Sequence, residues 1–106
     1  MDFLSRPEEM ILLAVWRLKD NAYCVPIRAQ VSKITGSEWS FGAVYLPLNR
    51  LEKKGIVTSK MGPSTPMRGG RAKRFYKLTP LGIKALAQVK KLSEVAWKKV
   101  PELSFE

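Results

Sequence analysis

Side chains suited to binding nucleic acid fall on one side of a helix predicted to begin after Ser40. Small residues let a helix backbone approach base edges, amides hydrogen-bond to bases, and cations neutralise phosphates. The alternatives are a solvated helix face and, for the two small residues, a plain role at the start of the helix. These outward residues are Gly42, Ala43, Leu46, Asn49, Arg50 and Lys53.

A second group of cations belongs to a predicted β-hairpin. The β-prone runs Ile56–Met61 and Lys73–Leu78 are separated by GPSTPMRGGRA, whose glycines and prolines exclude continuous regular structure. Basic side chains on such a hairpin reach phosphates or the minor groove, although Lys and Arg also serve simply to block pairing at a sheet edge. The cations concerned are Arg68, Arg71, Lys73 and Arg74.

The net charge is concentrated in the same part of the chain. The 106 residues carry 19 Lys and Arg against 9 Asp and Glu, a formal net charge of +10. Residues 40–78 hold nine basic residues and one acidic residue, so this segment carries +8, whereas residues 1–39 are neutral overall. Such a distribution favours a polyanionic partner.

The composition argues against an enzyme and against a metal site. The chain has no histidine and a single cysteine, Cys24, so it lacks the means for an internal disulfide, a Ser-His pair or a structural zinc site. Glu8 and Glu9 are adjacent, point about 100° apart on a helix and cannot flank one substrate bond. We expect no cofactor, and we interpret Cys24 as a reduced packing thiol rather than a redox switch.

The first helix is predicted over residues 7–20. Pro7 suits its first turn because the N–H that proline lacks has no helical partner there. The run Met10–Trp16 is apolar on every face, so this helix needs more cover than one small domain supplies, which indicates a subunit partner. Trp16 and Trp39 are interpreted as core or hinge packing.

Three further helices are predicted. An extended link over residues 22–25 leads into a helix that begins at Pro26 and is stopped by Gly36. The third has Ser40 as its N-cap, and the fourth runs from Pro80 to about Val100. The stripe that the third helix buries is Phe41, Val44, Leu48 and Leu51.

Three helices, a β-hairpin and a last helix make up the order of a winged helix-turn-helix, a mainly α fold with a β-hairpin wing. In this fold the third helix enters the major groove and the wing, here the hairpin over residues 56–78, reaches the backbone beside it. We predict a winged helix-turn-helix DNA-binding domain over residues 1–78 and a C-terminal dimerisation helix with a short tail over 79–106, forming one compact domain. No segment is apolar enough to span a membrane, so a cytoplasmic location is expected.

The stretches GAVYLPLNRLEKKGIV (residues 42–57) and GGRAKRFYKLTPLGIKAL (residues 69–86) resemble the PadR family of bacterial transcriptional regulators, in its short form with a single C-terminal helix. The resemblance implies a homodimer, held by the last helix packing on the partner's first helix. It also implies repression at a palindromic operator in double-stranded DNA, released by a small molecule.

The resemblance adds a role for one more side chain of the third helix. Tyr45 matches a family tyrosine that donates to a DNA phosphate, the alternative being a ring half-buried beside Leu48. The complete set of predicted DNA contacts is therefore Ser40, Gly42, Ala43, Tyr45, Leu46, Asn49, Arg50, Lys53, Arg68, Arg71, Lys73 and Arg74.

Two positions depart from the family pattern. Proline often follows the helix-three tyrosine directly, but here Leu46 intervenes and Pro47 comes next; it removes one intrahelical hydrogen bond and leaves the pitch of the helix open. The link before the second helix often contains glycine, whereas this chain has Cys24-Val25-Pro26.

One arc of the last helix is the predicted dimer surface. Two copies of its tryptophan could sandwich a flat aromatic effector, as in multidrug-sensing short-form relatives that the chain resembles, but ordinary packing at the dimer interface is the preferred interpretation. The residues concerned are Leu86, Val89, Leu92, Ala96 and Trp97.

A second functional class stays open at this point. Winged helices also serve as adaptors, so the basic surface is alternatively a docking site for an acidic protein. Tight binding to such a partner, with only weak and sequence-blind DNA binding, would distinguish the adaptor from the regulator.

Overall fold

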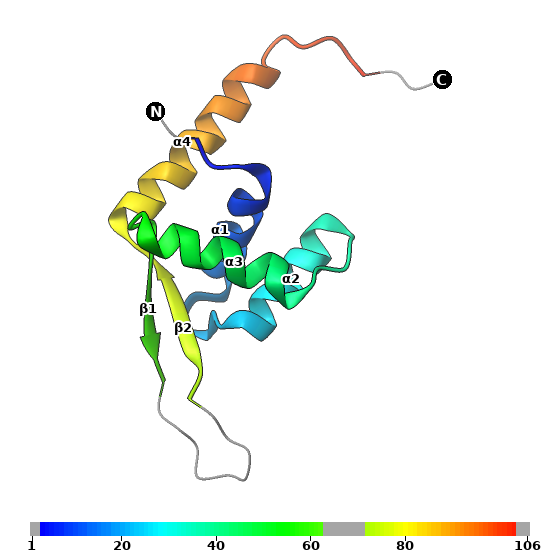
Figure 1. Cartoon of the computed structure of the whole chain (residues 1–106). Coiled ribbons are helices and arrows are strands. Elements are labelled where there is room, and N and C mark those ends of the chain that lie inside the picture. The colour runs from blue at the N-terminus through cyan, green and yellow to red at the C-terminus, as the bar shows by residue number, and fades with distance from the viewer. Residues whose placement is uncertain (1–2, 63–71, 104–106) are drawn as a thin grey trace.

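A computed structural model describes residues 3–62 and 72–103 and confirms the four helices and the β-hairpin (Figure 1). In Figure 1, α3 crosses in front of α1, and α4 leaves the base of the hairpin in the direction opposite to the strands. The elements are α1 (Arg6–Leu18), the 3₁₀ turn η1 (Lys19–Asn21), α2 (Cys24–Thr35), α3 (Phe41–Lys53), β1 (Val57–Met61), β2 (Arg74–Leu78) and α4 (Pro80–Trp97).

Helix α1 begins with a reciprocal cap. The Glu8 amide donates to Ser5 Oγ at 3.3 Å, and the Ser5 amide donates to Glu8 Oε1 at 2.8 Å. Each contact satisfies an N–H group that a helix start leaves without a partner, which explains why Glu8 is a buried acidic residue. The predicted end at residue 20 is wrong, because the α-helix gives way to η1 after Leu18 and Lys19 has a φ of 52°.

The start of α2 also differs from the prediction. The helix begins at Cys24, so residues 24 and 25 are helical and not extended. Pro26 occupies the third helical position, where the absent N–H costs no hydrogen bond within the helix. Gly36 ends α2 as predicted, with a φ of 71° and an amide that donates to the Ser32 carbonyl at 2.9 Å.

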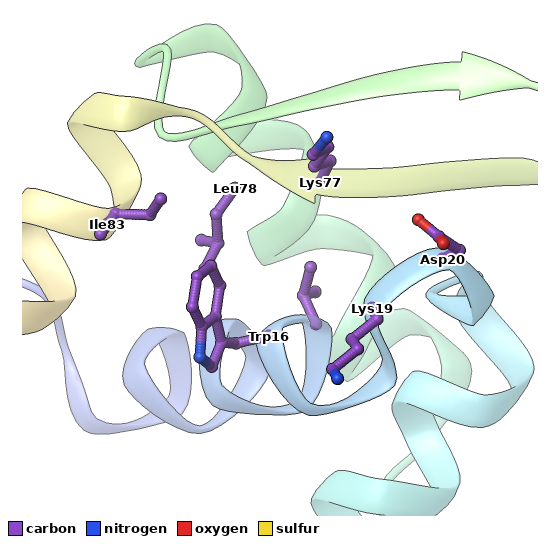
Figure 2. Close-up of a pocket in the computed structure, with 7 residues that line it drawn as sticks. Trp16, Lys19, Asp20, Lys77, Leu78 and Ile83 are labelled. Carbon is purple, nitrogen blue, oxygen red and sulfur yellow. The ribbon is translucent and has the colours of Figure 1, made fainter.

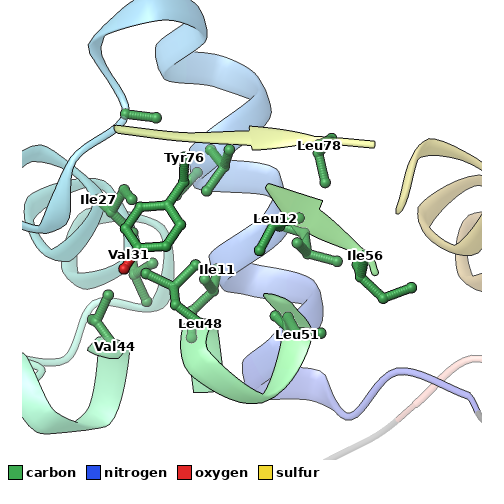
Figure 3. Close-up of a cluster of buried hydrophobic side chains, with 14 residues drawn as sticks. Ile11, Leu12, Ile27, Val31, Val44, Leu48, Leu51, Ile56, Tyr76 and Leu78 are labelled. Atoms are coloured by element: carbon green, nitrogen blue, oxygen red, sulfur yellow. The ribbon is translucent and has the colours of Figure 1, made fainter. Parts of the chain in front are cut away.

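Three of the four predicted core residues of α3 are fully buried, and Figure 3 shows them facing side chains from α1 and α2. Phe41 is the exception. Its side chain is 49% exposed because it stands at the first position of α3, where the ring lies beneath the guanidinium of Arg28. Pro47 lies inside a helix that continues to Lys53 and faces the core. The buried residues in contact are Ile11, Leu12, Ile27, Val31, Val44, Leu48 and Leu51.

The two strands form an antiparallel hairpin that is tied to the helices at one side. Val57 pairs with Leu78 and Met61 with Arg74, so each strand is a residue shorter than predicted. The amide of Tyr76 donates to the Ala22 carbonyl at 2.8 Å, which attaches β2 to the segment between η1 and α2.

The base of the hairpin meets α4 in a close backbone contact. The Ile56 carbonyl accepts from the amide of Thr79 at 3.1 Å and shares the Thr79 hydroxyl proton, at 3.0 Å, with the Gly55 carbonyl at 2.5 Å. Thr79 Oγ1 in turn accepts from the Gly82 amide at 3.0 Å and so caps α4. A Cβ at Gly82 would lie 2.1 Å from the Ile56 oxygen. Glycine is therefore required at this position. Helix α4 ends at Trp97, three residues before the predicted end at Val100.

Replacing Gly82 with alanine should destabilise the protein more than the same change in α3. Because the added Cβ meets a backbone oxygen and not a flexible side chain, we expect Gly82→Ala to lower the free energy of unfolding by about 2 kcal/mol or more. The control is Gly42→Ala, where the nearest atom is 4.0 Å away; alanine should leave stability unchanged or raise it by up to about 1 kcal/mol. Urea denaturation of both variants measures the difference, and equal effects would contradict the close-contact argument.

Candidate nucleic-acid interface

The predicted outer face of α3 is exposed in the structure. Gly42, Ala43, Arg50 and Lys53 are exposed, and Asn49 is partly exposed. Leu46 is 60% exposed, an unusual position for a large apolar side chain. Helix α3 thus presents a surface of small, amide and basic residues around one leucine, opposite the core stripe.

Tyr45 projects from α3 beside this face. Tyr45 is 47% exposed, so part of its side chain is accessible from solvent and part is covered. Ser40 has a structural task, because its hydroxyl oxygen accepts from the Ala43 amide at 3.1 Å and caps α3. Capping gives the first turn of the helix a defined orientation.

Two of the four predicted wing cations lie in the described part of the chain, and both are exposed. Lys73 places Nζ 4.5 Å from the centroid of the Tyr23 ring. Arg74 donates from Nη1 to Ser59 Oγ at 3.0 Å, and that hydroxyl donates to Glu52 Oε2 at 2.5 Å. Arg68 and Arg71 lie outside the described residues.

Arg28 organises the turn between α2 and α3, a role that sequence patterns did not reveal. Its Nε donates to the Trp39 carbonyl, its Nη2 pairs with Glu38 at 3.3 Å, and its guanidinium stands 4.7 Å from the centroid of the Phe41 ring. One side chain of α2 therefore holds both the turn and the first residue of α3. No local motif marks such a residue, because its three contacts come from residues 10 to 13 positions away.

The two tryptophans predicted to pack in the core or at a hinge, Trp16 and Trp39, differ in the structure. Trp39 packs at the hinge as predicted: its amide donates to Ser32 Oγ at 3.2 Å and its Nε1 to Thr35 Oγ1 at 3.0 Å. The packing prediction is wrong for Trp16, which is 55% exposed. Figure 2 shows its ring standing beside Leu78 in a groove of about 460 Å³ where α1, β2 and α4 meet.

The predicted dimer surface of α4 is progressively uncovered toward the C-terminus. Leu86 and Val89 are partly buried, whereas Leu92 is 48% and Trp97 58% exposed. Val89, Leu92, Ala96 and Trp97 line one cavity of about 310 Å³ together with residues from the start of α1, and Leu86 lines the neighbouring groove.

The family model of the transcriptional regulator PadR-like family matches residues 12–88. This chain belongs to the PadR-like family. The match covers the second half of α1, all of α2 and α3, the hairpin and the first half of α4, and so includes every element that carries the candidate interface. The chain is a DNA-binding transcriptional regulator and not an enzyme.

Solved structures of PadR-like regulators share its fold. A PadR family transcription regulator from Clostridium difficile R20291 is 29% identical, with a TM-score of 0.72 over 89% of this chain and 93% of that one. A transcriptional regulator from Clostridium thermocellum is 26% identical, with a TM-score of 0.71 over 87% and 84% of the two chains. A PadR-like transcription factor from Bacteroides fragilis is 26% identical, with a TM-score of 0.68 over 84% of each. A comparison with curated proteins gave no match.

The part of this PadR-like chain that the structure describes holds neither a metal-binding cluster of side chains nor a membrane-spanning helix. Residues 3–62 and 72–103 contain no group of three or more acidic or cysteine side chains placed to hold a metal ion. Within the same ranges, every helix is too short or too polar to cross a membrane.

Replacing Arg28 with lysine should loosen the turn before α3 while keeping the charge. Lysine cannot make the Nε bond to the Trp39 carbonyl or present a flat guanidinium to Phe41, so we expect Arg28→Lys to lower the free energy of unfolding by about 1 to 2 kcal/mol. The control is Lys33→Met at an exposed position on the same helix, with an expected change within about 0.5 kcal/mol. Chemical denaturation measures both; an Arg28→Lys variant as stable as the parent would show that the contacts do not fix the turn.

Proposed function

We propose that this PadR-like regulator is a homodimeric repressor that binds a palindromic operator in double-stranded DNA and is released by a small-molecule effector. The observation that carries the proposal is the exposed face of α3. It joins small, amide and basic side chains with the wing cations in the segment that holds +8 of the net charge. A polyanion is the partner that such a surface binds.

The proposed DNA contacts are of two kinds, those to bases and those to phosphates. Side chains at the outer face of α3 read base edges in the major groove, and Asn49 is the one amide among them. Tyr45 and the cations bind backbone phosphates, which fixes the orientation of the protein on the duplex. The proposed contacts are those of the sequence analysis: Ser40, Gly42, Ala43, Tyr45, Leu46, Asn49, Arg50, Lys53, Arg68, Arg71, Lys73 and Arg74.

A homodimer accounts for the apolar surface of α1 and α4. Trp16 on α1 and Leu92 and Trp97 on α4 are each about half exposed, and a second copy that packs its α4 on this α1 removes them from water. Within one compact domain, residues 1–78 then form the DNA-binding part and 79–106 the dimerisation part. Trp97 also offers a flat apolar surface near the dimer axis, to which a small aromatic effector could bind.

DNA binding should be steeply salt-dependent. If the helix and wing of one subunit neutralise about four phosphates, log K for the dimer should fall against log[salt] with a slope of about −7. Fluorescence anisotropy of the DNA upstream of the gene, with a scrambled duplex as control, measures this slope; a slope near zero would exclude DNA as the partner of the basic segment.

Two variants test the division of contacts in the same assay. Lys53→Gln should weaken binding to both duplexes alike, whereas Asn49→Ala should reduce the preference of the protein for the upstream DNA. Loss of preference in the lysine variant alone would overturn the assignment.

The dimer should depend on the apolar face of α4. We expect Leu92→Glu to convert the dimer to a monomer, because a carboxylate would be buried without a partner in the interface. Sedimentation velocity gives the mass of each variant. Lys91→Glu, a neighbouring exposed position outside the apolar arc, is the control and should remain dimeric; a parent protein that sediments as a monomer at all concentrations would exclude the dimer.

A further inference from the structure

A pocket of about 330 Å³ opens between the start of α2, the middle of α3 and the lower part of β2. Three elements that are far apart in the chain contribute to it. Its lining contains two cations, three phenol rings and one thiol, and none of the described residues that line it is acidic. The residues are Tyr23, Cys24, Tyr45, Lys73, Arg74 and Tyr76.

The two cations are held from different directions. Lys73 Nζ lies over the Tyr23 ring, 4.5 Å from its centroid. Arg74 is oriented by the bond from Nη1 to Ser59 Oγ at 3.0 Å, which uses only part of its donor capacity. Both side chains therefore keep N–H groups for an anion in the pocket.

Tyr76 adds a phenol hydroxyl to the lining of the pocket. The residue is 5% exposed, and Figure 3 shows its ring reaching from β2 toward Val31 and Val44. Within residues 3–62 and 72–103 the buried side-chain oxygen without a partner is Gln30 Oε1, so the Tyr76 hydroxyl is not a buried group left unpaired. A phenol hydroxyl can donate one hydrogen bond, so Tyr76 offers the pocket a donor in addition to the two cations.

The thiol of Cys24 does not repel an anion, because it is uncharged at neutral pH. Burial raises the pKa of Cys24 above its ordinary value of 9.0, and the charge of Arg28 only partly offsets this effect. The group is therefore a neutral thiol at pH 7. Because Cys24 is the single cysteine of the chain, it is also a chemical reporter located inside the pocket.

We propose that this pocket binds one phosphodiester group of the DNA backbone, with Lys73, Arg74 and the hydroxyl of Tyr76 as donors. The assignment rests on the proposed function and extends it to Tyr23, Cys24 and Tyr76, which lie outside the face of α3. Tyr45 belongs both to the pocket lining and to the exposed surface beside that face, so a duplex against α3 brings its backbone to the pocket. Such a contact fixes position without reading sequence.

The first test measures the reaction of Cys24 with N-ethylmaleimide at neutral pH. A duplex of scrambled sequence suffices, because the contact is to the backbone. At a DNA concentration that saturates binding by anisotropy, we expect the modification rate to fall by about tenfold, since access to the thiol controls its reaction. Inorganic phosphate at the same phosphate concentration is the second arm and should give little protection; equal protection by free phosphate would overturn the assignment to DNA.

The second test compares variants in the salt dependence of binding. Lys73→Gln should flatten the slope of log K against log[salt] by about 0.9 per subunit, the contribution of one phosphate. Tyr76→Phe keeps the ring in the core and should weaken binding about fivefold at fixed salt through loss of the hydroxyl. The control is Lys77→Gln, an exposed lysine of β2 that does not line the pocket and should change neither quantity.

The outcomes separate this inference from the proposed function. If the parent protein binds DNA but the duplex leaves Cys24 fully reactive, or if Lys73→Gln has the same slope as Lys77→Gln, the pocket is not a phosphate site and the regulator remains. If the parent protein binds no duplex even at low salt, both are wrong. Thermal denaturation of Tyr76→Phe shows whether a loss of binding is caused by unfolding. If it is, the protection of Cys24 by DNA in the parent protein decides whether the pocket binds a phosphate.

Discussion

The relative orientation of α3, the wing and α4 depends on the contacts made by the carbonyl group of Ile56. It accepts two donors from Thr79, and it packs against Gly82 so closely that no side chain fits between them. The turn that leaves α3 and the turn that enters α4 are thereby held at one point. Because the hairpin begins and ends at these turns, the angle between α3, the wing and α4 follows from this contact.

Placement of α3 needs a second constraint at its other end, and Arg28 supplies it. The guanidinium joins the turn before α3 to the ring of Phe41, while the core stripe holds the helix along its length. Exposed residues on the outer face are thus presented by a helix fixed at both ends. A rigid helix loses less conformational entropy on binding than a mobile one, so such a surface is suited to recognising a regular polymer.

Periodicity predicted what depends on neighbours in the chain, namely the helices, the hairpin and the buried stripe of α3. It failed where distant residues decide. Pro26 resembles a helix start, yet α2 begins two residues earlier because a proline is tolerated anywhere in the first turn. Trp16 resembles a core residue, yet the described elements around it leave it 55% exposed.

The candidate site shows the same division. The outer face of α3 was predictable from helical spacing, which places its residues together without knowledge of the fold. Arg28 and Tyr76 were not, because the contacts of Arg28 with Trp39 and Phe41 and the place of Tyr76 in the pocket lining depend on the tertiary structure. The family resemblance added Tyr45, whose exposure no periodic pattern distinguishes from partial burial.

Pro47 removes one backbone hydrogen bond from α3. In an unbroken helix the amide of residue 47 donates to the carbonyl of residue 43, and proline has no such amide. Ala43, whose carbonyl therefore lacks this donor, lies on the exposed outer face of α3. The first turns of this helix are therefore held by one backbone hydrogen bond fewer than those of an unbroken helix, beside the small residues that we propose to lie against base edges.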